Sequence, residues 1–81
     1  MQKVRAKMNI FKYNTTFTID GIMIAEIRQG ISRPGRYSGA ICVFGRRKTV
    51  CDNCDYIDAI ECVSNNIYIM FKQIGLVVEF E

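Results

Sequence analysis

Apolar and polar residues alternate most regularly over Phe11–Arg28. In Phe11–Ile19 every second position holds Phe, Tyr, Thr, Phe and Ile in turn, which is the period of a half-buried strand. Asp20-Gly21 follows directly, and this pair favours a two-residue type I′ turn because both of its positions need a positive φ. Ile22–Arg28 then has the composition of the returning strand. The pattern therefore predicts a β-hairpin.

Four further segments have the composition of strands. Tyr37–Phe44 is apolar at both alternating sets of positions, which predicts a central strand, and Thr49–Cys51 predicts a short strand that pairs back. Ile67–Lys72 is rich in β-branched and aromatic residues. Leu76–Phe80 predicts a last strand with alternate residues facing inward. Residues 1–7, by contrast, predict a basic N-terminal arm.

The segments between these strands carry the residues of turns. Gln29–Arg36 contains the only proline, and its Pro34-Gly35 pair suits the central positions of a type II turn in an exposed loop. Gly45–Lys48 predicts a second turn. Ser64–Asn66 and Gln73–Gly75 predict two more, because asparagine and glycine tolerate the left-handed region.

Residues 52–63 have helical periodicity. One face of such a helix would hold Tyr56, Ile57, Ile60 and Val63. The carboxylates fall on the other face, and Asp52 is expected to cap the N-terminus. A strand would mix acidic and apolar side chains on one face, so a helix is favoured. A helix that ends near Ala59 and passes directly into a strand is the alternative.

These elements predict an α+β domain, an antiparallel twisted sheet of four to five strands with one packed helix (about 52–63). The alternative is an all-β small barrel in which that segment forms a turn and a strand. The 81 residues are expected to form a single domain, 1–81, with a small core. An apolar content of 49% favours self-association, and Val77 and Glu79 would leave the edge of the last strand open to a second copy.

Charge is strongly segregated along the chain. Residues 1–50 hold ten basic residues against two acidic ones, a balance of +8. Residues 51–81 hold one basic residue against six acidic ones, a balance of −5. Such a field attracts an anionic partner to one side or favours head-to-tail association of copies. The alternative is that both sets are ordinary solvated surface.

The candidate metal ligands are four cysteines: Cys42, Cys51, Cys54 and Cys62. There is no histidine, and a strong zinc signal needs two Cys-x-x-Cys pairs where this chain has one. Buried apolar thiols are therefore favoured, and no metal or other cofactor is expected. A redox pair is disfavoured because Asp52 and Asp55 would raise the thiol pKa values. A disulfide between Cys42 and Cys51 is a further alternative, although reduced thiols are expected without a secretion signal.

Basic side chains on the predicted loops are the candidate binding residues. They are Arg28, Arg33, Arg36, Arg46, Arg47 and Lys48, with Tyr37 beside them. Guanidinium groups match the geometry of carboxylates and phosphates, and arginine and tyrosine are enriched at protein interfaces. A protein partner is therefore expected. Basic groups beside a stacking ring also suit nucleic acid, although the pI of 8.8 is low for such a domain.

The sequence contains nothing that resembles a nucleophile paired with a base, a glycine-rich phosphate-binding loop or a pair of catalytic acids, so no catalytic residues and no enzymatic activity are expected. No segment approaches the ~20 apolar residues of a membrane span and no signal peptide is evident, which predicts a cytoplasmic location. By analogy with small proteins of viruses and mobile elements, the expected function is regulatory or inhibitory, by occupying a surface of a larger protein assembly. A small nucleic-acid-binding module and a zinc- or thiol-dependent module are the alternatives.

Overall fold

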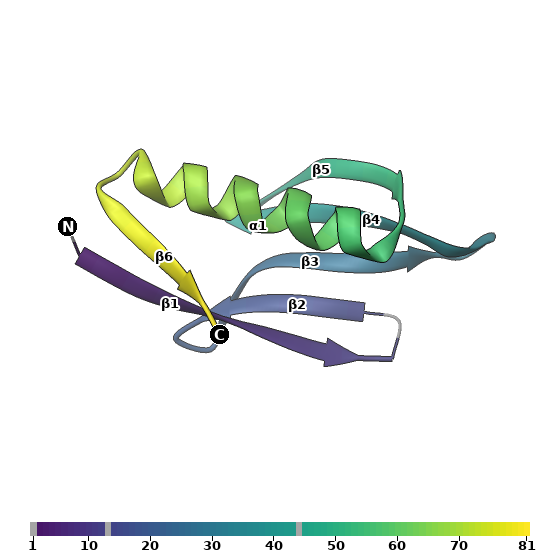
Figure 1. Ribbon diagram of the computed structural model, residues 1–81, viewed down its shortest axis with the longest axis horizontal. Coiled ribbons are helices and arrows are strands. Elements are labelled where there is room, and N and C mark those ends of the chain that lie inside the picture. Colours follow the sequence, from purple (N-terminus) through teal and green to yellow (C-terminus); the bar gives the residue numbers. More distant parts are fainter. Residues whose placement is uncertain (1, 13, 44) are drawn as a thin grey trace.

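The structure, a computed structural model, describes residues 2–12, 14–43 and 45–81 (Figure 1). Within these ranges it contains six strands and one helix. In chain order they are β1 (Gln2–Phe11), β2 (Asn14–Ile19), β3 (Ile22–Gly30), β4 (Arg33–Val43), β5 (Arg46–Cys54), α1 (Tyr56–Lys72) and β6 (Leu76–Phe80). The expected places of Tyr13 in the hairpin and of Phe44 at the end of the third strand fall outside the described ranges.

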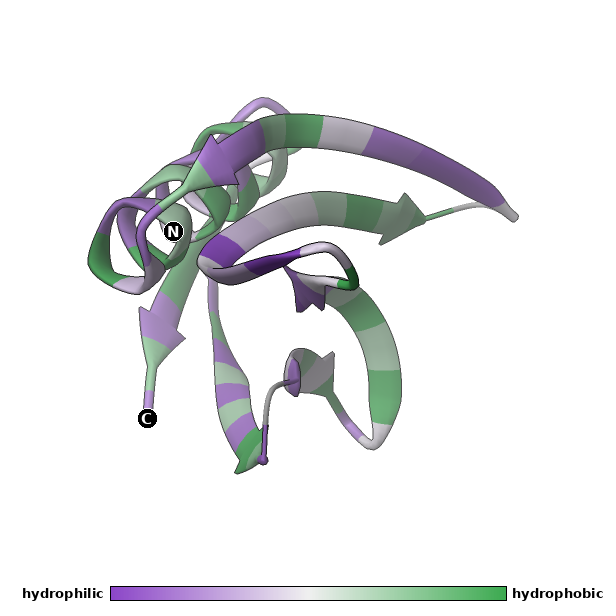
Figure 2. Cartoon of the chain, turned by 90° about the vertical axis from the view of Figure 1, so that its right-hand side faces the viewer, coloured by the Kyte–Doolittle hydropathy of each residue, from purple (hydrophilic) through white to green (hydrophobic). Residues whose placement is uncertain are grey.

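The six strands form one sheet in the order β5-β4-β3-β2-β1-β6. Neighbouring strands are antiparallel, except that β1 and β6 are parallel. α1 contacts β3, β4, β5 and β6, and the sheet is curled into a half-barrel beside it (Figure 2). The predicted α+β class with one packed helix is confirmed. The sheet has six strands where four to five were expected, it is mixed where an antiparallel one was expected, and its curl partly matches the barrel alternative.

The predicted hairpin is confirmed as β2 and β3, except that its first strand begins at Asn14, because Phe11 is the last residue of β1 and pairs with Asn14. Asp20 and Gly21 have φ angles of 52° and 78°, both positive as a type I′ turn requires. The alternation along β2 buries Thr15 and Phe17, each of which is about 1% exposed. The hydroxyl of Thr15 shares a hydrogen bond of 2.6 Å with the hydroxyl of Tyr56 on α1, so this buried polar atom is satisfied.

Residues 1–7 do not form the predicted arm, since those that are described belong to β1. This strand lies inside the sheet, between β2 and β6, and Ala6 is completely buried. Val4 is half-buried against the core, and basic residues occupy the alternate positions. Because basic residues occupy every second position, the period-two alternation of this strand was not recognised from the sequence. The strand that pairs with it, β6, lies at the other end of the chain.

The two predicted arginine-bearing loops are largely strand. β3 continues to Gly30 and β4 begins at Arg33, which leaves two residues between them. The Pro34-Gly35 pair lies in a bulge of β4, where Gly35 has a φ of 78° that glycine accepts without strain. Arg46–Lys48 form the start of β5 rather than a turn. Pairing with neighbouring strands satisfies backbone groups that an exposed loop would leave to water.

α1 begins later than the helix predicted over residues 52–63. Its N-cap is Asp55, whose carboxylate accepts a hydrogen bond from the N–H of Asp58 at 2.8 Å. Asp52, the expected cap, lies in β5. The buried face of α1 also differs from the predicted one. Ile57 was expected on the apolar face, but its side chain is 64% exposed.

α1 also continues through the predicted turn at 64–66 and the predicted strand at 67–72. Ala59, Val63 and Ile67 follow one another at helical spacing and are completely buried. The amide of Asn66 donates to the carbonyl of Cys62 at 2.8 Å, so this side chain is satisfied within the helix. Burial of the helix face outweighs the turn preference of asparagine and the β propensity of the residues that follow.

The end of the chain agrees with the prediction. Gln73–Gly75 form a turn, Gly75 has a φ of 84°, and β6 follows. Val78 is buried, and the ring of Phe80 packs edge-on against that of Phe17 with 6.2 Å between their centroids. In the described ranges, no helix combines the length and the apolar character needed to cross a membrane.

Candidate functional site

The seven residues predicted as binding residues are not brought together. They are grouped as Arg28 with Arg47, as Arg33 with Arg36 and Tyr37, and as Arg46 with Lys48. The second and third groups lie at opposite ends of the β4–β5 hairpin, because Tyr37 pairs with Cys54 and Val43 pairs with Arg46. The structure therefore contains three separate candidate binding sites.

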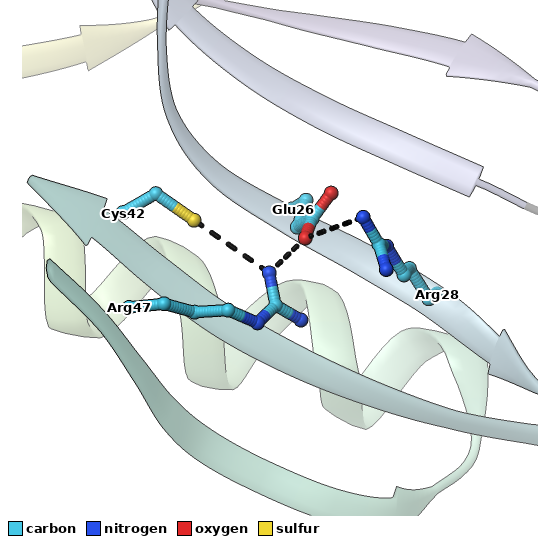
Figure 3. Close-up of polar contacts among 4 residues, drawn as sticks. All are labelled: Glu26, Arg28, Cys42 and Arg47. Carbon is cyan, nitrogen blue, oxygen red and sulfur yellow. Dashed lines mark hydrogen bonds and ion pairs between the residues drawn. The ribbon is translucent and has the colours of Figure 1, made fainter. Parts of the chain in front are cut away.

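Arg28 and Arg47 bind one carboxylate, that of Glu26 (Figure 3). Glu26 lies on β3 and is 7% exposed. Nη2 of Arg28 lies 3.1 Å from its Oε1, and Nη1 of Arg47 contacts the same oxygen. Arg47 also donates to Sγ of Cys42 at 3.7 Å. These arginines stabilise a buried carboxylate, so they are poor candidates for capturing an external anion.

The group around Tyr37 lies near the start of α1. Nε of Arg36 donates to Oδ1 of Asn53 at 3.2 Å, and its Nη2 donates to the Asn53 carbonyl. The ring of Tyr37 packs on that of Tyr56 with centroids 5.1 Å apart. Arg33 is exposed beside a cavity of only about 50 Å³. The aromatic ring expected to stack on a ligand is thus a packing residue, half-buried against the helix.

Arg46 and Lys48 line a cleft of about 650 Å³ between the β4–β5 hairpin and α1. Its other lining residues are Ile41, Val43, Val50, Asn66, Ile69, Met70 and Gln73. The volume is within the range of ligand-binding clefts. The helical half of this cleft was missed from the sequence, because residues 64–72 were assigned to a turn and a strand. Helical spacing of Asn66, Ile69, Met70 and Gln73 is the signal that would have grouped them.

The cleft combines an apolar floor with positive charge at one side. Strand alternation places Arg46 and Lys48 on the same side of β5, and Val50 lines the cleft with them from the irregularity between the pairs Ala40–Thr49 and Gly39–Cys51. No carboxylate lines the cleft, and neither cation forms an ion pair with any residue in the described ranges. On the helix, Ile69 is 56% exposed. An occupant that suits this cleft has apolar side chains and negative charge.

The four cysteines do not form a common site. All are free thiols, and no group of metal-ligating residues within 2–12, 14–43 and 45–81 could hold an ion. Cys42 pairs with Arg47 across the sheet, whereas Cys51 pairs with Gly39. The alternative disulfide between Cys42 and Cys51 is therefore not formed. The Cys-x-x-Cys pair, Cys51 to Cys54, lies at the end of β5, ahead of the N-cap of α1, rather than at the start of the helix predicted over residues 52–63.

Cys51 has a pKa well above the ordinary value of a thiol. Burial raises the pKa of Cys51 from its ordinary value of 9.0 to about 12, with further contributions from a hydrogen bond with Cys54 and from the nearby Cys62 and Cys54 thiols. The direction agrees with the expectation, but the cause does not, because the carboxylates of Asp52 and Asp55 play no part in it. A thiol that stays protonated is a poor nucleophile.

We expect Cys51 to resist alkylation and to make stability depend on alkaline pH. Its folded pKa lies above its unfolded value, so its contribution is complete below about pH 9 and is lost as pH rises towards 12. Urea unfolding measures the free energy of unfolding of the wild type and of Cys51→Ala across this pH range. Tyrosines and lysines are present in both proteins, so the difference between the two pH profiles isolates the contribution of Cys51. Alkylation of native Cys51 as fast as in the unfolded chain at about pH 9, read by peptide mass spectrometry, would contradict it.

Comparison of this chain with known protein families, with curated proteins and with solved structures finds no match.

Proposed function

We propose that this protein is a non-catalytic binding protein that occupies a surface of a larger protein assembly, and that the cleft lined by Arg46 and Lys48 is its contact site. The observation that supports this is the pairing of an apolar floor with two cations that lack ion-pair partners in the described residues. Buried apolar anchors beside charged rims are typical of protein interfaces.

A protein partner is favoured over nucleic acid by how the other cations are used. Lys3 lies 3.1 Å from Glu79, and Arg5 lies 3.7 Å from Glu81. Arg28 and Arg47 share Glu26, as described above. Nucleic-acid binding needs cations that are free to replace counterions along a backbone. Of the six basic residues that suggested such a surface, Arg28 and Arg47 are bound to a carboxylate within the fold, which leaves fewer cations for a nucleic-acid backbone.

The proposal includes a regulatory role, such as inhibition of the assembly by stoichiometric occupation, with neither cofactor nor chemical reaction. A viral or mobile-element source is part of this proposal by analogy of size and composition alone. The four free thiols suit a reducing compartment, which favours the cytoplasm.

The test is a comparison of two double charge reversals. Tagged wild type, Arg46→Glu/Lys48→Glu and Arg33→Glu/Arg36→Glu are used to capture partners from extract of the native source, with and without nuclease treatment, and the partners are identified by mass spectrometry. Both variants change the charge equally, and the Arg36 hydrogen bonds are exposed, so their loss costs little stability. Only the variant of Arg46 and Lys48 is expected to lose the partner.

Circular dichroism and thermal melting show whether both variants are folded. Equal capture by all three proteins would refute the cleft as the contact site. Capture that disappears after nuclease treatment, together with salt-sensitive binding to random-sequence RNA or DNA, would favour the nucleic-acid alternative instead.

A further inference from the structure

β5 is an outermost strand of the sheet. It pairs with β4 along one edge, and no strand pairs with its other edge in the part of the chain that the structure describes. Arg46, Arg47, Lys48 and Thr49 are all exposed along it. An exposed strand edge with unpaired backbone groups is a template for an added strand.

The side chains of β5 fix what an added strand would meet. Arg46, Lys48 and Val50 line the cleft, and Arg47 contacts Glu26, which the cleft does not include. In a strand paired with β5, every second side chain would therefore lie on the cleft side, beside Arg46 and Lys48 and then near Val50. Val50 lies at the irregularity of β5 and its carbonyl accepts a hydrogen bond from Sγ of Cys62 at 3.3 Å, so the strand pairing is expected over Arg46–Thr49. The sequence order along that side of β5 is cation, cation, apolar.

Resting on the proposed function, we propose that the partner supplies an extended segment that pairs with the outer edge of β5. Its cleft-side residues are acidic opposite Arg46 and Lys48 and apolar near Val50. The pattern is acidic-x-acidic-x-apolar for a parallel strand and apolar-x-acidic-x-acidic for an antiparallel one. Opposite charges facing each other across strands stabilise the pairing, and the apolar residue extends over the floor of the cleft.

Charge also favours an acidic partner segment over a second copy of the chain as the occupant of this edge. Two β5 edges brought together would oppose Arg46-Arg47-Lys48 with the same three cations, and such repulsion is a common protection of edge strands. The carboxylates of the other outer strand, Glu79 and its neighbour Glu81, are bound to Lys3 and Arg5 of their own chain. An acidic segment of a different protein is therefore the better match.

The experiment uses the full chain and two labelled peptides, Thr-Ile-Thr-Glu-Thr-Glu-Thr and Thr-Glu-Thr-Glu-Thr-Ile-Thr. Each is also made with lysine in place of glutamate, and each acidic peptide with N-methyl groups on one or the other alternate set of backbone amides. Fluorescence anisotropy measures binding to the wild type, to Arg46→Glu/Lys48→Glu and to Arg33→Glu/Arg36→Glu. N-methylation removes the donors of one edge of the peptide and leaves its charge unchanged.

One acidic peptide is expected to bind, and the lysine version is not. Methylation of the amide set that faces β5 should abolish binding, whereas methylation of the other set should not. Arg46→Glu/Lys48→Glu should weaken binding by about tenfold or more, and Arg33→Glu/Arg36→Glu should leave it unchanged.

Equal binding of both methylated forms would overturn the strand pairing, and continued sensitivity to Arg46 and Lys48 would leave the proposed function intact. If no peptide binds but the partner is still captured, the strand pairing is likewise overturned and the proposed function is retained. Binding that ignores the charge reversal of Arg46 and Lys48 would instead overturn the proposed site. Dimerisation of the free protein that this reversal abolishes would assign the edge to a second copy and overturn the partner segment.

Discussion

Phe17→Ala is expected to remove a large share of the protein's free energy of unfolding. Phe17 is the largest of the fully buried side chains, and its ring packs edge-on against Phe80 from the last strand. Truncation of a buried phenylalanine costs about 3–5 kcal/mol. A domain of this length has a free energy of unfolding of roughly 4–12 kcal/mol. The loss is therefore a large share of the total stability.

The matched control is Phe11→Ala. Phe11 lies on the neighbouring strand and is 72% exposed, so its truncation should change stability by no more than about 0.5 kcal/mol. Urea unfolding followed by circular dichroism measures both variants, and Phe17→Leu supplies a smaller loss if the alanine variant is too unstable to titrate. Equal unfolding midpoints for Phe17→Ala and Phe11→Ala would show that β2 is not packed as described.

Gly39→Ala is expected to be the second most damaging change, although it adds only one methyl group. A Cβ at this position would lie 2.4 Å from Cγ2 of Val63 and 3.1 Å from Sγ of Cys51. Val63 is completely buried in α1, and a β-branched side chain in a helix has little rotamer freedom with which to move away. The helix must shift, and overpacking of this kind costs about 1–3 kcal/mol.

A double-mutant cycle with Val63→Ala tests the origin of that cost. Val63→Ala alone should destabilise by leaving a cavity, but in the Gly39→Ala background it should restore stability, because the two methyl groups compete for the same space. A coupling free energy of about 0.5–3 kcal/mol is expected from urea unfolding of the four proteins. Strictly additive losses would place α1 away from Gly39.

The contact between Gly39 and Val63 also has a functional meaning. This contact allows the middle of α1 to pack close to β4. The C-terminal part of the same helix lines the cleft with Ile69 and Met70. A displaced helix would change the width of the cleft. Gly39→Ala is therefore expected to weaken binding of an occupant as well as stability.

Local pattern was sufficient for the elements that depend on neighbours in the sequence. The hairpin around Asp20-Gly21 and the last strand, Leu76–Phe80, were predicted because turn chemistry and period-two alternation act over a few residues. The single packed helix was also predicted, although its boundaries were wrong. Two of the seven expected binding residues, Arg46 and Lys48, line the cleft, but nothing in their local sequence distinguishes them from Arg47.

What the sequence determined on its own was the alternation, the turns at Asp20-Gly21 and Gln73–Gly75, and the uneven charge, each of which is a property of adjacent residues. The tertiary structure decided the rest through pairing between distant segments. It turned a basic lead-in into β1 beside β6, kept residues 64–72 helical because Val63 and Ile67 are buried, and divided the cations among Glu26, Asn53 and the cleft. Burial against a distant partner outweighs a local preference of a few tenths of a kcal/mol, and that partner cannot be read from nearby residues.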